Sequence, residues 1–142
     1  MYWQELSTTS HYKTAVAIKD QIALNNLTEA SIGIEELIQA LSRSEKRALK
    51  SQLIRLMLHI IKWRSQPERR SFSWIASIKD ARDEIADIQE ESPSLNDSTI
   101  EGLWDKDFII ANRDAQAEMH VKSSVKSLSW HDVFEQEYDL EK

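Results

Sequence analysis

The sequence predicts an all-α fold, a helical bundle of five to six helices around a central antiparallel helix pair. Only two glycines and two prolines occur in 142 residues, whereas a β-sandwich or barrel needs many more turn residues. Apolar residues instead recur every three or four positions, which is the spacing of one helix face. The length fits a single domain over residues 1–142. Within it we expect an N-terminal arm over residues 1–9 and a C-terminal tail over residues 120–142 that carries a short helix.

Two helices are expected before residue 42. The first covers residues 10–24, where Ala15, Ile18 and Ile22 repeat at helix spacing. The second begins at Thr28, a preferred N-cap residue, and carries one apolar stripe made of Ile34, Leu37, Ile38 and Leu41. Gly33 costs this helix about 1 kcal/mol relative to alanine, but its small size allows a neighbouring helix to approach closely.

The central pair follows. Ser42 and Glu45 have the spacing of a capping box, which predicts the start of a third helix. Its apolar stripe is wide enough to face partners on more than one side, and comprises Leu49, Leu53, Leu56, Met57 and Ile60. Pro67 ends this helix, and residues 64–71 reverse the chain. The fourth helix, over residues 73–91, has a coiled-coil-like seam of Trp74, Ile78, Ala81, Ile85 and Ile88.

Two further elements complete the predicted fold. Ser98 and Glu101 again have capping-box spacing and predict a fifth helix, whose apolar stripe extends to Met119. A short sixth helix over residues 129–138 has Trp130, Val133 and Phe134 as apolar anchors.

Composition restricts the classes of function. The chain has no cysteine, so disulfides, zinc ribbons and thiol catalysis are excluded. No run of 18 apolar residues could span a membrane, and the N-terminus lacks the features of a secretory signal. We therefore expect a cytoplasmic protein with no membrane contact.

The charges are segregated along the chain, whose net charge is −6. Residues 43–82 hold 11 Lys and Arg against 3 Asp and Glu, a balance of +8. Residues 83–142 hold 5 against 16, a balance of −11. A functional interpretation must account for the basic block.

Several motifs carry a family resemblance. They are Arg43-Ser-Glu-Lys-Arg-Ala-Leu, His59-Ile-Ile-Lys-Trp63, Gln66-Pro-Glu-Arg-Arg-Ser71 followed by Ser73-Trp74, and the Ser-Pro-Ser-Leu element at residues 92–95. Together they resemble the bacterial family known as domain of unknown function 29, which is abundant in cyanobacteria. The resemblance implies a helical fold and brings no activity, cofactor or catalytic residue with it.

The candidate site is a cluster in which basic and aromatic residues alternate: His59, Lys62, Trp63, Arg64, Arg69, Arg70 and Trp74. One interpretation is intramolecular. Guanidinium groups at a helical turn can bind free helix-end carbonyls or acidic residues of the same domain. The other is nucleic-acid association, in which cations bind phosphate and rings stack on bases. The negative net charge favours the intramolecular interpretation.

The leading functional hypothesis is a non-enzymatic protein-interaction or regulatory module with an unidentified protein partner, of which a homodimer is one form. The alternative is a nucleic-acid-associated protein that uses the cluster over residues 62–74. The third is a metal-dependent enzyme in which His59 joins Asp83 or Asp87. The sequence has no second histidine at helical zinc spacing and no catalytic motif. We therefore expect no catalytic residue, no metal and no cofactor.

Overall fold

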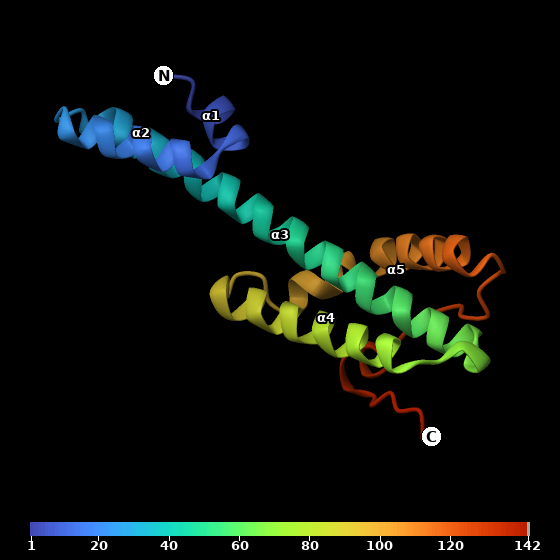
Figure 1. Cartoon of the computed structure of the whole chain (residues 1–142). Helices are drawn as coiled ribbons and strands as arrows, with labels where there is room; N and C mark the ends of the chain where they lie inside the picture. Colours follow the sequence, from blue (N-terminus) through green and yellow to red (C-terminus); the bar gives the residue numbers. More distant parts are fainter. Residues whose placement is uncertain (142) are drawn as a thin grey trace. The chain divides into compact units, whose positions relative to one another are not determined.

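A computed structural model of the chain describes residues 1–141, and this part of the chain is all-α, as predicted. The elements are α1 (Trp3–Thr9), α2 (His11–Ala23), α3 (Leu27–Ser65), the 3-10 turn η1 (Pro67–Arg69), α4 (Phe72–Glu91), α5 (Asp97–Met119) and the π-helical turn η2 (His131–Glu135) (Figure 1). The last residue of the expected C-terminal tail, Lys142, lies outside the described residues. The chain divides into two compact units, one over Met1–Arg47 and one from Ala48 onward.

The predicted break near Ser42 is wrong, because α3 continues without interruption from Leu27 to Ser65. The capping-box pattern of Ser42 and Glu45 is present in the sequence, but no chain reversal accompanies it. Strong helix formers surround both residues, so helix propagation satisfies their backbone donors instead. Two predicted helices are therefore one helix of 39 residues.

The first unit is built around a helical turn between α2 and α3. Ser10 caps α2 by accepting a hydrogen bond from the Lys13 amide at 3.1 Å. Asn25 adopts a left-handed conformation with φ of 62°, which allows the chain to reverse before α3. Residues 1–9, where an arm is expected, contain the short helix α1.

Gly33 allows the core of the first unit to close. This core consists of Trp3, Ile18 and Ala30, with Leu37 packed against it. A Cβ atom at Gly33 would lie 2.7 Å from the Trp3 ring and 2.8 Å from Ile18, closer than side-chain atoms can pack. The Trp3 indole also donates a hydrogen bond to Glu29 at 2.8 Å. The close approach predicted at Gly33 is confirmed.

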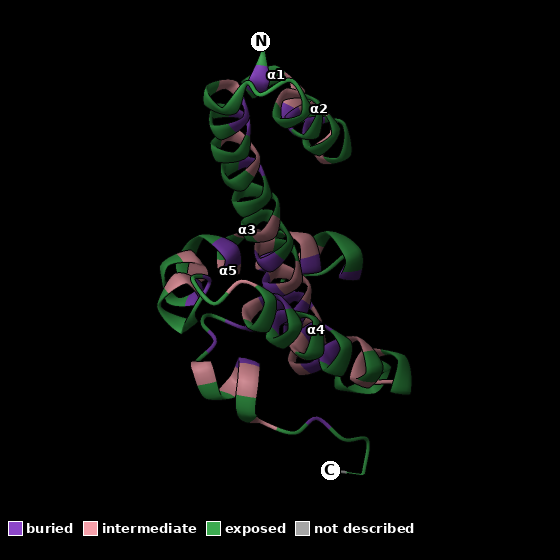
Figure 2. Cartoon of the chain, turned by 90° about the vertical axis from the view of Figure 1, so that its left-hand side faces the viewer, coloured by how far each residue is buried: buried purple, intermediate pink, exposed green. Residues whose placement is uncertain are grey.

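The second unit contains the predicted central pair. After the turn at η1, α4 runs back along the C-terminal part of α3 (Figure 1). The stripe of α3 is completely buried, and its members Leu49, Leu53, Leu56, Met57 and Ile60 are all 0% exposed. In Figure 2, buried positions, in purple, occur along this part of α3. The seam of α4 is buried from Ile78 to Ile88, while Trp74 is half-buried at its start. The apolar spacing of both helices thus predicts which faces form the core.

The ends of α5 and of the C-terminal segment differ from the prediction. Asn96 caps α5 by accepting a hydrogen bond from the Thr99 amide at 3.1 Å, so the proposed cap at Ser98 is wrong. Asn is at least as good an N-cap as Ser, and Ser98 lies inside the first turn. The expected helix over residues 129–138 is shorter and is a π-helical turn over His131–Glu135.

Candidate functional site

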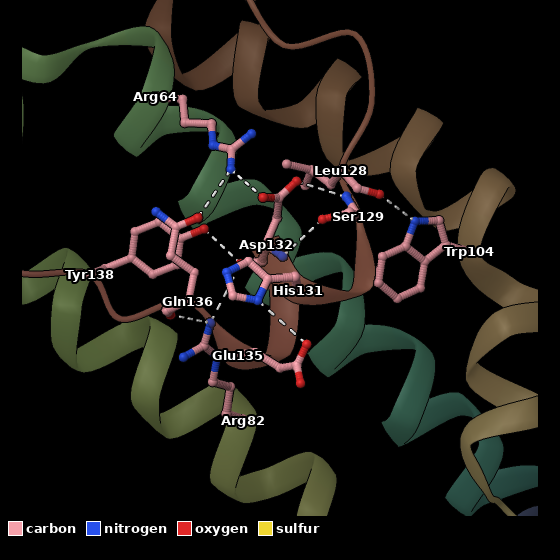
Figure 3. Close-up of polar contacts among 10 residues, drawn as sticks. All are labelled: Arg64, Arg82, Trp104, Leu128, Ser129, His131, Asp132, Glu135, Gln136 and Tyr138. Atoms are coloured by element: carbon pink, nitrogen blue, oxygen red, sulfur yellow. Dashed lines mark hydrogen bonds and ion pairs between the residues drawn. The ribbon is translucent and has the colours of Figure 1, made fainter.

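The seven predicted site residues lie in the second unit, on the last turns of α3, on η1 and its C-cap, and on the first turn of α4. The structure does not gather them into one free surface. Most of them contact other parts of the same unit, and two of them, Trp63 and Arg64, contact the C-terminal segment that contains η2. Figure 3 shows the contact of Arg64.

Arg64 binds this C-terminal segment directly. Its Nη2 atom donates to Oδ1 of Asp132 at 2.6 Å and to the Gln136 side chain at 3.4 Å (Figure 3). The other carboxylate oxygen of Asp132 accepts a hydrogen bond from the Ser129 amide at 2.8 Å. Burial by itself would raise the pKa of Asp132, but the hydrogen bonds from Ser129 and Arg64 outweigh it and hold the pKa below its ordinary value of 3.8.

The Arg70 side chain caps the C-terminal end of α3. Its Nε atom donates to the carbonyl oxygen of Trp63 at 2.8 Å, a group in the last turn of the helix that has no intrahelical donor. The guanidinium lies 4.8 Å from the centroid of the Trp63 ring, within cation–π range. Trp63 is itself buried and meets Tyr138 edge-to-face at 5.7 Å. This is the contact that the intramolecular interpretation expects for Arg70.

Lys62 and Trp74 form a third contact within the cluster. The Lys62 Nζ atom lies 3.3 Å from Oε1 of Glu118 on α5 and 5.0 Å from the centroid of the Trp74 ring. Lys62 thus links α3 to both α4 and α5. Its side chain is only 14% exposed, so it presents little charge to a ligand.

His59 contacts the backbone of its own helix. Its Nδ1 atom lies 2.9 Å from the backbone oxygen of Arg55, and since a carbonyl only accepts, Nδ1 carries the proton of the neutral ring. Burial lowers the pKa of His59 below 6.5 and outweighs this hydrogen bond, which favours the charged ring. Within residues 1–141, no group of three or more acidic and histidine side chains could hold a metal ion.

Arg69 differs from the other cations. The intramolecular interpretation predicts that it pairs with a carboxylate or a helix-end carbonyl, and for Arg69 this prediction is wrong. Arg69 is exposed. Among residues 1–141, no hydrogen bond or ion pair involves its side chain. The reason is local: residues 67–69 are all exposed on η1, so only Arg70, the residue that follows, reaches the end of α3.

Arg82 is a further cation of this site and was not among the residues predicted from the sequence. From α4, its Nε atom donates to the backbone oxygen of Val133 at 2.8 Å, and its Nη2 atom donates to that of Gln136 at 2.8 Å (Figure 3). The guanidinium also lies 5.6 Å from the Tyr138 ring. The sequence does show that Arg82 is a cation next to Ala81, a member of the buried seam of α4. It does not show what Arg82 binds, because the acceptors of Arg82 lie about fifty residues further along the chain.

The second unit also contains an ion pair of which only the carboxylate is fully buried. Asp107 on α5 is 0% exposed and lies 3.2 Å from Nζ of Lys50. Burial raises the pKa of this carboxyl and outweighs the opposing attraction of Lys50. A pair with so costly a desolvation adds little net stability.

The first unit exposes a second surface of interest. Four large apolar residues of α3, which we call the α3 seam, are 43–61% exposed: Leu27, Ile34, Ile38 and Leu41. The stripe predicted from the sequence included Ile34, Ile38 and Leu41 together with Leu37. Only Leu37 packs against the Trp3 cluster. The face of α3 that packs into the core carries Ala30, Gly33, Leu37 and Ala40. The last three each come one position before a seam residue, so the core face lies about 100° around the helix from the seam.

None of the helices described over residues 1–141 has the length and apolar character that crossing a membrane requires. Searches of curated proteins and of solved structures found no match to the chain. One family model does match, that of "Domain of unknown function DUF29", over residues 13–139. The match covers most of the chain and confirms the resemblance seen in the motifs. The chain belongs to the DUF29 family.

Proposed function

We propose that this chain is a non-enzymatic protein-interaction module of the cytoplasm and that the α3 seam is its contact surface. The observation that carries the proposal is the exposure of Leu27, Ile34, Ile38 and Leu41 along one ordered helix. Isolated apolar residues on a surface need no explanation, but several large ones on one face of a helix mark an interaction site.

The basic cluster supports the proposal by its contacts. Lys62, Arg64 and Arg70 each bind a group of the same unit, respectively Glu118, Asp132 and the Trp63 carbonyl. These three cations of the basic cluster are thus engaged within their own unit, which supports the intramolecular interpretation. A cytoplasmic location accords with a chain that has no cysteine, since it gains nothing from an oxidising compartment.

The proposal is tested by affinity capture from cells that express the chain in place of the original copy. Ile38→Glu puts a charge at the centre of the seam. Ile109→Glu makes the same change at an exposed site on α5, 67% exposed, and serves as the matched control. We expect the wild type and Ile109→Glu to retain the same bound proteins and Ile38→Glu to lose them. Equal capture by all three chains would refute the seam as the contact surface.

Nucleic-acid association is a second candidate because two positions of the cluster over residues 62–74 are available to a ligand. Arg69 is exposed, and Phe72, three residues further along the same stretch, is 77% exposed. A cation beside an aromatic ring suits a single strand. Fluorescence anisotropy with a labelled oligonucleotide tests this candidate. Binding that Arg69→Ala weakens, with a salt slope reduced by about one, would support it, and no salt-dependent binding would exclude it.

A further inference from the structure

We propose that a cavity at the C-terminal end of α3 binds a free amino acid, which is held by the guanidinium of Arg70 and the carboxylates of Glu137 and Asp139. The cavity has a volume of about 310 Å³ and is lined by the end of α3, by Arg70 and by residues 136–139. Ligand pockets start at about this volume, so the cavity suits a small molecule. It lies in the second unit and the α3 seam in the first, so this proposal does not depend on the proposed function.

Arg70 gives the cavity a cation that is held in place and still has donors available. Its Nε atom donates to the Trp63 carbonyl at 2.8 Å, and its guanidinium lies 4.8 Å from the centroid of the Trp63 ring. Within residues 1–141, its Nη1 and Nη2 atoms form no hydrogen bond or ion pair. These two atoms are the fork that binds a carboxylate through two parallel hydrogen bonds. Arg64 also lines the cavity, but Asp132 already binds it at 2.6 Å, so Arg70 is the available cation.

Two carboxylates line the same cavity, those of Glu137 and Asp139. Both residues are exposed, and within the described part of the chain neither forms an ion pair. Asp139 accepts one hydrogen bond, from the Glu141 amide to its Oδ1 atom at 3.0 Å. The lining therefore carries opposite charges that do not neutralise each other. The carboxylates would repel a ligand that is only an anion, and the guanidinium would repel one that is only a cation. A ligand that carries both charges fits.

A free amino acid is a small molecule with both charges on one carbon atom. Its carboxylate accepts hydrogen bonds from the Arg70 fork, and its ammonium group donates to the carboxylates of residues 137 and 139. The remaining lining includes the rings of Trp63 and Tyr138, which meet edge-to-face at 5.7 Å. An amino acid with an apolar side chain therefore suits the cavity, and leucine is the probe.

The first experiment titrates the isotope-labelled full chain with leucine and follows the amide signals by NMR. The amides of residues 136–139 should shift in a saturable way, with a dissociation constant of about 1 mM or below. Two analogues each remove one charge of the ligand: leucinamide has no carboxylate, and N-acetylleucine has no ammonium group. Each should bind at least about tenfold more weakly than leucine, because each loses one charged contact.

The second experiment removes the charges of the cavity instead. The double change Glu137→Gln and Asp139→Asn should weaken leucine binding by about tenfold or more. Glu135→Gln makes the same kind of change at an exposed position of the same segment outside the cavity, and should bind leucine as the wild type does. Arg70→Lys keeps the charge and removes the fork, and should weaken binding by about tenfold. Circular dichroism checks that Arg70→Lys folds; if it does not, the double variant and the two analogues decide.

Three results would overturn the proposal. The first is the absence of a saturable shift up to roughly 20 mM leucine, well above the expected dissociation constant. The second is N-acetylleucine or inorganic phosphate that shifts the same amides as strongly as leucine, since the cavity would then bind simple anions. The third is a double variant that binds leucine as tightly as Glu135→Gln, since the two carboxylates would then hold no ammonium group. Weaker binding of both analogues and of the double variant supports the site.

Discussion

Arg82 provides the sharpest test of how the C-terminal segment is held. Its guanidinium donates to two backbone oxygens of that segment, those of Val133 and Gln136, both at 2.8 Å. Arg82→Ala removes both donors. A hydrogen bond to a charged group contributes about 1.5–3 kcal/mol, and an acceptor left buried without a partner costs about 1–3 kcal/mol. Arg82 is half-buried, so water can replace part of the loss. We therefore expect the free energy of unfolding of the second unit to fall by about 2–4 kcal/mol.

The assay is urea denaturation followed by tryptophan fluorescence. Four of the five tryptophans, Trp63, Trp74, Trp104 and Trp130, lie in the second unit, so the signal reports mainly on it. Hydrogen exchange adds a local readout, and the amides of residues 131–138 should exchange faster in Arg82→Ala. Lys79→Ala is the matched control. It removes an exposed cation three residues earlier on α4 and should change stability by less than about 0.5 kcal/mol.

An Arg82→Ala chain that is as stable as Lys79→Ala, with unchanged exchange over the C-terminal segment, would contradict this role of Arg82. That result would mean that the apolar anchors of the segment hold it without the guanidinium. Those anchors include the buried Val133 and the stacked pair of Trp104 and Trp130, whose ring centroids are 5.6 Å apart.

Further changes test other parts of the structure. Leu53→Ala, at a fully buried site, should lower the free energy of unfolding by about 2–5 kcal/mol, measured by urea denaturation; a loss below about 1 kcal/mol would mean that the stripe is not core. Arg70→Ala should cost about 1–3 kcal/mol and lower the melting temperature, whereas Arg69→Ala should leave it unchanged; equal effects would contradict the different roles given to these two cations. Gly33→Ala brings a methyl group within 2.7 Å of the indole that packs on it and should destabilise the first unit by about 1–3 kcal/mol, seen as faster proteolysis of residues 1–9. Because the pKa of His59 is lowered in the folded chain, its contribution is complete above the unfolded pKa of about 6.5 and is lost as pH falls below it. His59→Gln should flatten that dependence in a pH series of denaturation curves, and an unchanged series would show that another group titrates.

The spacing of apolar residues predicts burial of a helix face only where the same chain also supplies the surface that covers that face. The seam of α4 from Ile78 to Ile88 is buried as its spacing predicts, because α3 and α5 of the same unit lie against it. The stripe around Ile38 has equally regular spacing and remains exposed. Spacing shows that a helix face can be covered, but it does not show what covers it.

The candidate site illustrates the same limit. The sequence pointed to the basic cluster, and its Arg70 contact is local, only seven residues away from its acceptor in the chain. The acceptors of Arg64 and Arg82 lie between 51 and 72 residues away. No local pattern encodes such pairs, because they depend on where the C-terminal segment docks.

By itself, the sequence determined the all-α class, the antiparallel pairing of α4 with α3, and the family. These depend on helix spacing, on the scarcity of turn residues and on short motifs, all of which are properties of neighbouring positions. Only the tertiary structure decided that α3 passes through Ser42 unbroken and that Asn96 rather than Ser98 caps α5. The same holds for the basic cluster, most of whose charges are directed inward. The physical reason is that the alternative caps, ion-pair partners and exposed helix faces differ little in local free energy. Contacts between distant segments therefore decide which alternative forms.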